Sequence, residues 1–394
     1  MRQRESQHHN HRYYSSFFLG VFVVIISIVN VAQYHQILPN IPSPSNTTVV
    51  NENGSLSHSP TSTSLNNACD RARDINPDAI LANVTIDMKD IDPNNSKLNE
   101  ESIKFSILVF SERVDKYISR GILNGKVHER DLSTFIAKAL PLDAGNNNTI
   151  NDDVWAVDIG ANVGYHSLHM VRRGASVISF EPAPDTRALL ECSATMLVTS
   201  STQKGRSSQY HDVRRGSIQI IPAGASNERS EGFMTRHPDS PGMTTFRTNL
   251  DNSFPFEKVN FSNDEGSEKN GGSIQLVRVQ DILEAKGVPE GRSPKLRLLK
   301  LDAEGFELKA LQGLNLTRYP FQYFTYEFFP SLLREKNGSE AGTTDEPLEL
   351  LRMVREAGYI CDKDDVIGST KEEMQTWIDG IKESQHVNMF CQLE

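Results

Sequence analysis

The sequence predicts an α/β fold built on a mostly parallel, seven-stranded sheet, preceded by a transmembrane helix and a disordered stem. Three observations lead to this prediction. From residue 154 onward, short apolar runs alternate with helical patterns. A glycine-containing turn follows the first of these runs. The first hundred residues contain one long apolar segment and then almost no apolar periodicity.

The apolar segment near the amino terminus predicts a membrane anchor. Eleven of the thirteen residues from Phe17 to Val29 are Phe, Leu, Val or Ile, which favours insertion by roughly 3 to 6 kcal/mol. Three arginines precede the run, and no Lys or Arg follows it until Arg71. We therefore expect residues 1–16 to be a cytosolic tail and 17–34 a signal anchor, with the rest of the chain in the lumen of the Golgi or ER. A cleaved signal peptide is the alternative, since its apolar stretch need only be about 7–15 residues.

Residues 35–103 are rich in Ser, Thr, Asn and Pro, which predicts a disordered lumenal stem. The catalytic domain is then expected at 104–394, with its core at 152–330. Eight glycosylation sequons fit a lumenal location. They begin at Asn46, Asn53, Asn83, Asn94, Asn147, Asn260, Asn315 and Asn337.

Charge and cysteine content exclude two classes of site. The net charge is −10, and no block of five basic residues occurs, so a nucleic-acid partner is not expected. The four cysteines lack C-x-x-C spacing, which argues against zinc. Disulfide pairing in an oxidising lumen and buried free thiols both remain open.

The elements of the domain follow from apolar runs and from helix-end signals. Strands are expected at 104–110, 154–158, 176–180, 217–221, 274–279, 296–301, 323–328, 359–361 and 387–393. Helices are expected at 131–139, 165–173, 184–196, 306–312, 347–357 and 371–382, with a short one opening at 281. Gly174, Gly313 and Gly358 end three of these helices, and Pro184 lies in the first turn of another. Polar inserts at 199–216 and 249–272 interrupt the pattern.

The turn after the first core strand indicates a cofactor site. The segment 154–164 reads Val-Trp-Ala-Val-Asp-Ile-Gly-Ala-Asn-Val-Gly, and Phe-Glu-Pro follows at 180–182. A dinucleotide fingerprint would need glycine where Asn162 and Tyr165 stand, so a pyrophosphate fits poorly. S-adenosyl-L-methionine is the better fit. The predicted contacts are Asp158, Gly160, Asn162 and Gly164 around its amino-acid moiety and Glu181 on its ribose. The alternative is a βα unit that uses glycine only for packing.

The segment Asp302-Ala-Glu-Gly-Phe-Glu307 is the expected acceptor side. Methyl transfer needs a group that takes the acceptor's proton, and Asp302 or Glu304 could act as that base or steady the sulfonium. Glu304 could instead only favour the start of the following helix, by about 0.3–1 kcal/mol. His166 is a further candidate base. Glu327 could hold acceptor hydroxyls.

Two further expectations concern this segment. Glu307 lies one turn beyond Glu304 and is expected to be structural or solvated. Two carboxylates alone could hold a divalent cation, but no third ligand has suggestive spacing, so no metal is expected.

Four motifs resemble the FkbM methyltransferase family in order and spacing. They are the segments 157–165, 180–184, 299–313 and 326–330, and the resemblance extends over roughly residues 105–392. It implies a class I, S-adenosylmethionine-dependent methyltransferase that acts on hydroxyl groups of sugars or other small polar acceptors. The two polar inserts and His166, where the family usually has an aromatic residue, depart from the pattern. Because of these departures, the resemblance does not identify the acceptor.

The expected function is therefore O-methylation of a glycan or another polar, hydroxylated acceptor in the secretory pathway. A type II membrane glycosyltransferase that uses a nucleotide sugar is the alternative, because it shares the anchor and stem. Its D-x-D motif would be Asp90-Ile-Asp92 or Asp362-Lys-Asp364. A third possibility is a scaffold that binds the cofactor without turnover.

Overall fold

A computed structural model of the chain describes ten stretches of sequence. They are residues 62–87, 89, 102–141, 154–202, 216–237, 240–247, 257–258, 273–335, 345–382 and 384–394. The expected tail (1–16) and signal anchor (17–34) lie outside them. Within the described stretches, no helix is both long and apolar enough to cross a bilayer.

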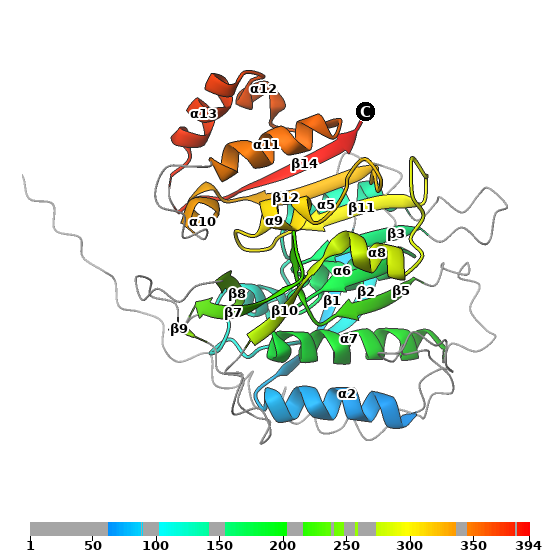
Figure 1. Cartoon of the computed structure of the whole chain (residues 1–394). Coiled ribbons are helices and arrows are strands. Elements are labelled where there is room, and N and C mark those ends of the chain that lie inside the picture. The colour runs from blue at the N-terminus through cyan, green and yellow to red at the C-terminus, as the bar shows by residue number, and fades with distance from the viewer. Residues whose placement is uncertain are drawn as a thin grey trace, which may run out of the picture.

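A seven-stranded sheet forms the centre of the domain (Figure 1). Its strands are β3 (Trp155–Ile159), β4 (Ser176–Phe180), β5 (Ser217–Ile221), β11 (Leu296–Leu301), β12 (Tyr323–Phe328), β13 (Tyr359–Cys361) and β14 (Val387–Leu393). Their order is β13-β14-β12-β11-β3-β4-β5. Only β14 runs against its neighbours, and the other pairs are parallel. The expected mostly parallel sheet is confirmed.

Helices cover both faces of this sheet, which explains why its strands are apolar on both sides. In β3, Val157 and Ile159 pack into one core and Ala156 into the other. The first core includes α8 (Val279–Ala285), α9 (Glu307–Gln312), α11 (Glu346–Glu356) and α13 (Lys371–Gly380). The second includes α5 (Arg130–Ala139), α6 (Tyr165–Arg172) and α7 (Pro184–Thr202). The remaining short helices are α4 (Ile118–Leu123), α10 (Pro330–Glu335) and α12 (Asp364–Ile367).

A second sheet lies beside the carboxyl end of β5. It contains β6 (Gly224–Ser226), β7 (Ser230–His237), β8 (Ser240–Arg247), β9 (Glu257–Lys258) and β10 (Ser273–Arg278). The strand expected at 274–279 belongs to this sheet, where it pairs with β6 and β7. Strands β7 and β8 of this sheet are not predicted by the sequence, because polar residues alternate irregularly along them.

The expected stem, 35–103, needs correction over residues 62–87, which are ordered. Helix α2 (Ser62–Ile75) packs along α7, as Figure 1 shows. Strand β1 (Ile80–Asp87) pairs antiparallel with β2 (Ser102–Val109) over its full length. The physical reason is a one-sided strand: Ala82, Val84 and Ile86 are buried at every second position, and polar residues between them face solvent. Surrounding Asn, Asp and Pro residues hide this short alternation in the sequence.

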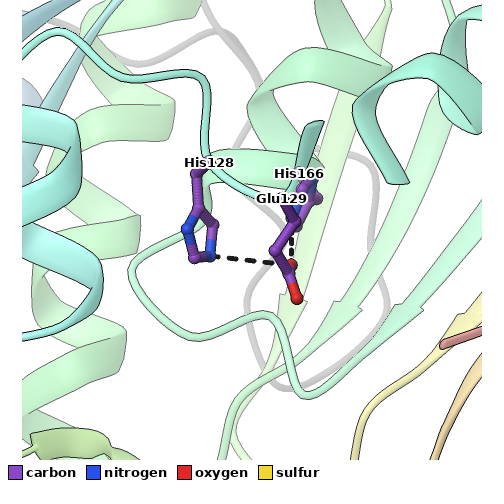
Figure 2. Close-up of side chains that lie close together, drawn as sticks. All are labelled: His128, Glu129 and His166. Atoms are coloured by element: carbon purple, nitrogen blue, oxygen red, sulfur yellow. Dashed lines mark hydrogen bonds and ion pairs between the residues drawn. The ribbon is translucent and has the colours of Figure 1, made fainter. Parts of the chain in front are cut away.

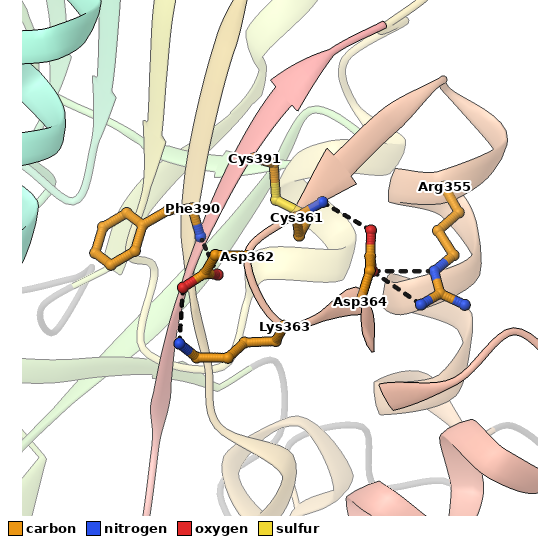
Figure 3. Close-up of a disulfide and its surroundings, with 7 residues drawn as sticks. All are labelled: Arg355, Cys361, Asp362, Lys363, Asp364, Phe390 and Cys391. Carbon is orange, nitrogen blue, oxygen red and sulfur yellow. Dashed lines mark hydrogen bonds and ion pairs between the residues drawn. A yellow bond between two sulfur atoms is a disulfide. The ribbon is translucent and has the colours of Figure 1, made fainter. Parts of the chain in front are cut away.

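The four cysteines form two disulfides, which settles the alternative left open above. Cys69 on α2 is bonded to Cys192 on α7. Cys361 on β13 is bonded to Cys391, directly opposite it on β14 (Figure 3). The first bond fastens the amino-terminal helix to the domain, and the second joins the last two strands of the central sheet.

Candidate active site

The turn after β3 is shaped by backbone that only small or special residues adopt. Gly160 has a φ of +78°, and a Cβ atom there would lie 1.7 Å from the carbonyl oxygen of Asp302. Asn162 also has a left-handed φ, +53°, and its side-chain oxygen accepts a hydrogen bond from the Val163 N–H at 2.8 Å. Gly164, with φ +94°, leaves room for Leu190 of α7. The turn therefore lies close against the end of β11.

Glu181 follows β4 and binds this turn directly. One of its carboxylate oxygens accepts from the Asn162 N–H at 2.8 Å and the other accepts from the Ala183 N–H at 2.8 Å. Burial raises the pKa of Glu181 to about 7. Each oxygen retains a second lone pair, so the ionised carboxylate can still accept hydrogen bonds from a ligand.

A cavity opens in front of these residues, with about 1040 Å³ of empty space when its open mouth is included. Gly160, Asn162 and Glu181 line it, and so do the predicted acceptor-side residues Asp302 and Glu304. The carboxyl ends of β3, β4 and β11 meet here, which is where open α/β sheets bind ligands. The structure thus brings the two predicted halves of the site into one cavity.

Asp158 and Gly164 were expected at the cofactor but lie behind the cavity wall, outside the residues that line it. The Asp158 carboxylate is fully buried and accepts a hydrogen bond from the Ser167 hydroxyl at 2.6 Å. Its other oxygen lies 3.1 Å from the Lys300 ammonium. Asp158 therefore acts on the cavity through Lys300, which lines it, and does not line the cavity itself.

Lys300 is a site residue that the sequence reasoning missed. Its buried ammonium donates to the Gly160 carbonyl at 3.0 Å and lies 3.4 Å from the Asp302 carboxylate. Burial disfavours the charged ammonium, but the charges of Asp158 and Asp302 outweigh this and raise the pKa of Lys300. A lysine inside the apolar strand Leu-Arg-Leu-Leu-Lys-Leu was the available signal, because a buried charge needs partners.

The part of the cavity that was predicted to face the acceptor is strongly acidic. Oxygens of Asp302, Glu304 and Glu327 all lie within 4.8 Å of one another. Burial raises the pKa of Glu327 well above its ordinary value, and the charges of Asp302 and Glu304 raise it further. Burial likewise raises the pKa of Asp302, while Lys300 opposes this rise. Glu327 therefore adds a third carboxylate to Asp302 and Glu304. It lies close to them because β12 pairs with β11.

Glu307 is structural, as expected. One of its buried carboxylate oxygens accepts from the N–H groups of Ala303 and Gly305, at 2.9 and 3.0 Å. These bonds hold the sharp turn on which Glu304 adopts a φ of +50°. Glu307 therefore stabilises the backbone turn from which the Glu304 side chain projects.

His166 lies at the cavity together with two residues that the sequence reasoning missed, His128 and Glu129 (Figure 2). The His166 Nε2 atom is 2.7 Å from an oxygen of Glu129, and the His128 Nε2 atom is 3.6 Å from the same oxygen. Burial and the neighbouring His166 lower the pKa of His128 to about 4. Burial alone would raise the pKa of Glu129, but the hydrogen bond from His166 and the charge of His166 outweigh this and lower it. No local pattern marks His128 or Glu129, since only the packing of α5 against α6 brings them to His166.

Of the two D-x-D motifs of the alternative function, the one that the structure describes, Asp362-Lys-Asp364, does not line this cavity. Asp362 accepts from the Phe390 N–H and pairs with Lys363, and Asp364 accepts from the Cys361 N–H and from Arg355 (Figure 3). Both carboxylates therefore hold the β13–β14 end of the sheet together. The motif at 90–92 lies outside the described residues.

The strand order, the glycine turn and the acidic residue after the second parallel strand together define the methyltransferase class of α/β fold. Comparison with protein families matches residues 158–361 to the methyltransferase FkbM domain. The chain belongs to the FkbM methyltransferase family, whose members typically use S-adenosylmethionine.

Two curated fungal proteins are similar to this chain. "Methyltransferase sdnD" of Sordaria araneosa is 30% identical over 169 residues, which cover 40% of this chain and 60% of that protein. "Methyltransferase 1" of Beauveria bassiana (strain ARSEF 2860) is 28% identical over 177 residues, which cover 42% of this chain and 59% of that protein. The chain thus spans about three-fifths of the length of these relatives.

Proposed function

We propose that this protein is an S-adenosylmethionine-dependent O-methyltransferase that modifies a hydroxyl of a glycan or another polar acceptor in the lumen of the secretory pathway. One observation carries the catalytic half of the proposal. A single cavity joins the turn at Gly160 and Asn162, the carboxylate of Glu181, and the acidic group that contains Asp302. A donor and an acceptor bound there would meet at the carboxyl end of β11.

The donor would lie along the first part of this cavity. Glu181 would accept hydrogen bonds from both ribose hydroxyls, and the turn would contact the amino-acid moiety through its backbone. When bound, the cofactor supplies an electrophilic methyl group on a positively charged sulfur. Ionised carboxylates at Asp302 and Glu304 would favour this sulfonium through their negative charge.

Transfer would be an in-line displacement. The acceptor oxygen would form a bond to the methyl carbon as the carbon–sulfur bond breaks with its electrons returning to sulfur, which would release S-adenosylhomocysteine. The hydroxyl proton would pass to a carboxylate, and we assign this role to Asp302, which lines the cavity at the end of β11. Its raised pKa makes it a stronger base than an ordinary aspartate, as general base catalysis requires.

Features outside the cavity support a lumenal acceptor. The apolar run at 17–29 and the arginines before it favour a type II anchor. Both disulfides are typical of an oxidising compartment. Among the sequon asparagines that the structure describes, Asn83 and Asn315 are exposed. Glycans and glycoproteins are the abundant hydroxylated molecules of that compartment.

The test is an assay of the purified full chain with donor labelled in its methyl group and with fractionated cellular glycans. We expect label in a glycan fraction, located on an oxygen by mass spectrometry, and no label with the Asp302→Asn variant. Turnover of a nucleotide sugar in place of S-adenosylmethionine would instead support the glycosyltransferase alternative. Binding of the donor without transfer to any glycan, peptide or small-molecule pool would point to a scaffold.

A further inference from the structure

Two imidazoles and one carboxylate converge at one wall of the cavity (Figure 2). One ligand atom each from His128, Glu129 and His166 lies within 4.8 Å of the others. Both Nε2 atoms point at the same oxygen of Glu129, at 2.7 Å from His166 and 3.6 Å from His128. Figure 2 shows them approaching that oxygen from different directions.

The three side chains are held in place by their surroundings. His166 is only 5% exposed, and its ring stacks on that of His128 with 5.4 Å between ring centroids. The Tyr165 hydroxyl accepts from the backbone N–H of His128, and the Tyr165 ring meets the His128 ring edge-on. Glu129 has a φ of +44°, in the left-handed region that residues other than glycine rarely adopt. Strain of this kind persists where the surrounding fold imposes it, often at functional sites.

A simple ion pair does not account for this arrangement. The His166 ring alone is enough to form the hydrogen bond with Glu129. The His128 ring is directed at the same Glu129 oxygen but lies too far from it for a hydrogen bond. Two nitrogens and one carboxylate oxygen are, however, a common ligand set for divalent transition-metal ions. Ligand atoms at about 2.1 Å from an ion lie roughly 3 to 4 Å apart. The observed spacing therefore requires side-chain adjustments of about 1 Å or less.

We propose that His128, Glu129 and His166 bind one divalent transition-metal ion. Three protein ligands leave coordination positions open toward the cavity, as in catalytic metal sites. The second acidic group, which contains Glu304, is a set of oxygens alone and suits harder cations such as magnesium. The mixed nitrogen and oxygen set distinguishes the proposed site from it.

A role for the ion in catalysis rests on the proposed function, whereas metal binding itself does not. The hydroxyl oxygen of the acceptor would occupy an open position on the ion, which lowers the pKa of that hydroxyl. Its proton passes to Asp302, which lines the same cavity. The oxygen then forms its bond to the methyl carbon as the carbon–sulfur bond breaks. Donor and acceptor are the only reactants that this step needs.

The test is a metal titration of the purified full chain after treatment with a chelator. Cobalt(II) is the first probe, because its visible absorption reports nitrogen ligands, and zinc(II) and manganese(II) then compete with it. We expect one equivalent to bind. His128→Asn and Glu129→Gln should each weaken binding by roughly 100-fold, at least as much as the loss of an outer-shell partner. Glu304→Gln is the matched control and should bind the ion as the unaltered chain does.

Unfolding midpoints of all variants establish that the binding changes do not reflect misfolding. His128 is partly exposed, with 22% of its side-chain surface accessible, so His128→Asn should retain the fold even if Glu129→Gln does not. Failure of the unaltered chain to bind any of the three ions would overturn the proposal. So would binding that is lost in Glu304→Gln and retained in His128→Asn, since the ion would then lie in the acidic group.

The catalytic role is tested apart from the binding. If methyl transfer occurs and chelation or His128→Asn reduces it by about tenfold or more, the ion assists the reaction. If transfer is unaffected by both, the ion has no part in it. Binding of the ion to a chain that transfers no methyl group would contradict the proposed function and leave the metal site standing.

Discussion

The shape of the cavity depends directly on the lack of a side chain at Gly160. A Cβ atom at this position would lie 1.7 Å from the Asp302 carbonyl oxygen, and the φ of +78° already disfavours any other residue. The end of β3 can approach the end of β11 only because of this glycine. That approach brings the donor side of the cavity next to Asp302.

We predict that Gly160→Ala lowers the free energy of unfolding by about 2–5 kcal/mol, from backbone strain and from the clash. Gly287→Ala is the matched control, because Gly287 has a similar φ of +66° but nothing within 4 Å of its added Cβ. The control should lose only about 1–2 kcal/mol. Urea unfolding of both variants measures the difference, and equal losses would contradict the close contact.

We predict that donor binding depends on pH through the carboxyl group of Glu181. Its pKa is raised from 4.5 to about 7 in the folded protein. In the proposed donor site the carboxylate form of Glu181 would accept hydrogen bonds from the ribose hydroxyls, so donor affinity should rise with pH, by about tenfold between pH 6 and pH 8. Between pH 4.5 and 7 the folded state binds more protons at this group than the unfolded state, so the same group lowers stability as pH rises.

Calorimetric titrations with S-adenosylmethionine at several pH values measure this dependence. Glu181→Gln provides the control, because its amide does not titrate. It should bind the donor weakly at every pH and show a much flatter profile. A rise in affinity of the same size in Glu181→Gln would assign the titration to another group.

Among the secondary-structure elements, the amino-terminal helix α2 and strand β1 are attached to the domain in two ways. Strand β1 adds to β2, and the Cys69–Cys192 bond joins α2 to α7. That bond closes a loop with a sequence separation of 123 residues, against 30 for Cys361–Cys391. In the chain-entropy account, the longer loop gives the larger stabilisation.

We therefore predict that replacing both Cys69 and Cys192 by Ser lowers the free energy of unfolding by about 1 kcal/mol more than the corresponding change at Cys361 and Cys391. Hydrogen exchange adds a local measurement. The first pair of replacements should raise exchange in α2, and the second should raise it in β13. An equal or reversed order of stability would show that local packing outweighs the length of the loop.

The central elements were predictable because each has a local cause. All seven strands of the main sheet are short apolar runs bounded by turn residues, and their predicted positions agree closely with the observed ones. Helix α7 continues beyond the expected end at 196 to Thr202, since nothing in the sequence forces it to stop there. The turn at Gly160 and the carboxylate at Glu181 follow from motif spacing.

Other features depend on contacts between distant segments and have little local signal. Strand β1 alternates Ala and Val with polar residues, and its buried face is evident only beside β2. The second sheet forms from strands whose apolar pattern is weak. Glu327 joins Asp302 because β12 pairs with β11, and His128 meets His166 because α5 packs on α6. Such pairs arise from tertiary structure, which one sequence does not display.

For the whole molecule, we predict an amino terminus in the cytosol and a catalytic domain in the lumen. The exposed sequon asparagines Asn83 and Asn315 should then carry glycans in cells. Glycosidase treatment should shift the electrophoretic mobility of the full chain, and the double replacement by Gln should reduce the shift. Protease applied to sealed vesicles should leave the domain intact. Digestion of the domain without detergent would contradict this topology.

In the proposed enzyme, S-adenosylmethionine binds at the ends of β3 and β4. Isothermal titration of the full chain with this molecule tests it most directly. We expect one donor per chain, with an affinity about 10- to 100-fold weaker in Glu181→Ala, which loses hydrogen bonds to a charged group. Absence of binding by the unaltered chain, or equal affinity in a correctly folded Glu181→Ala variant, would contradict the claim.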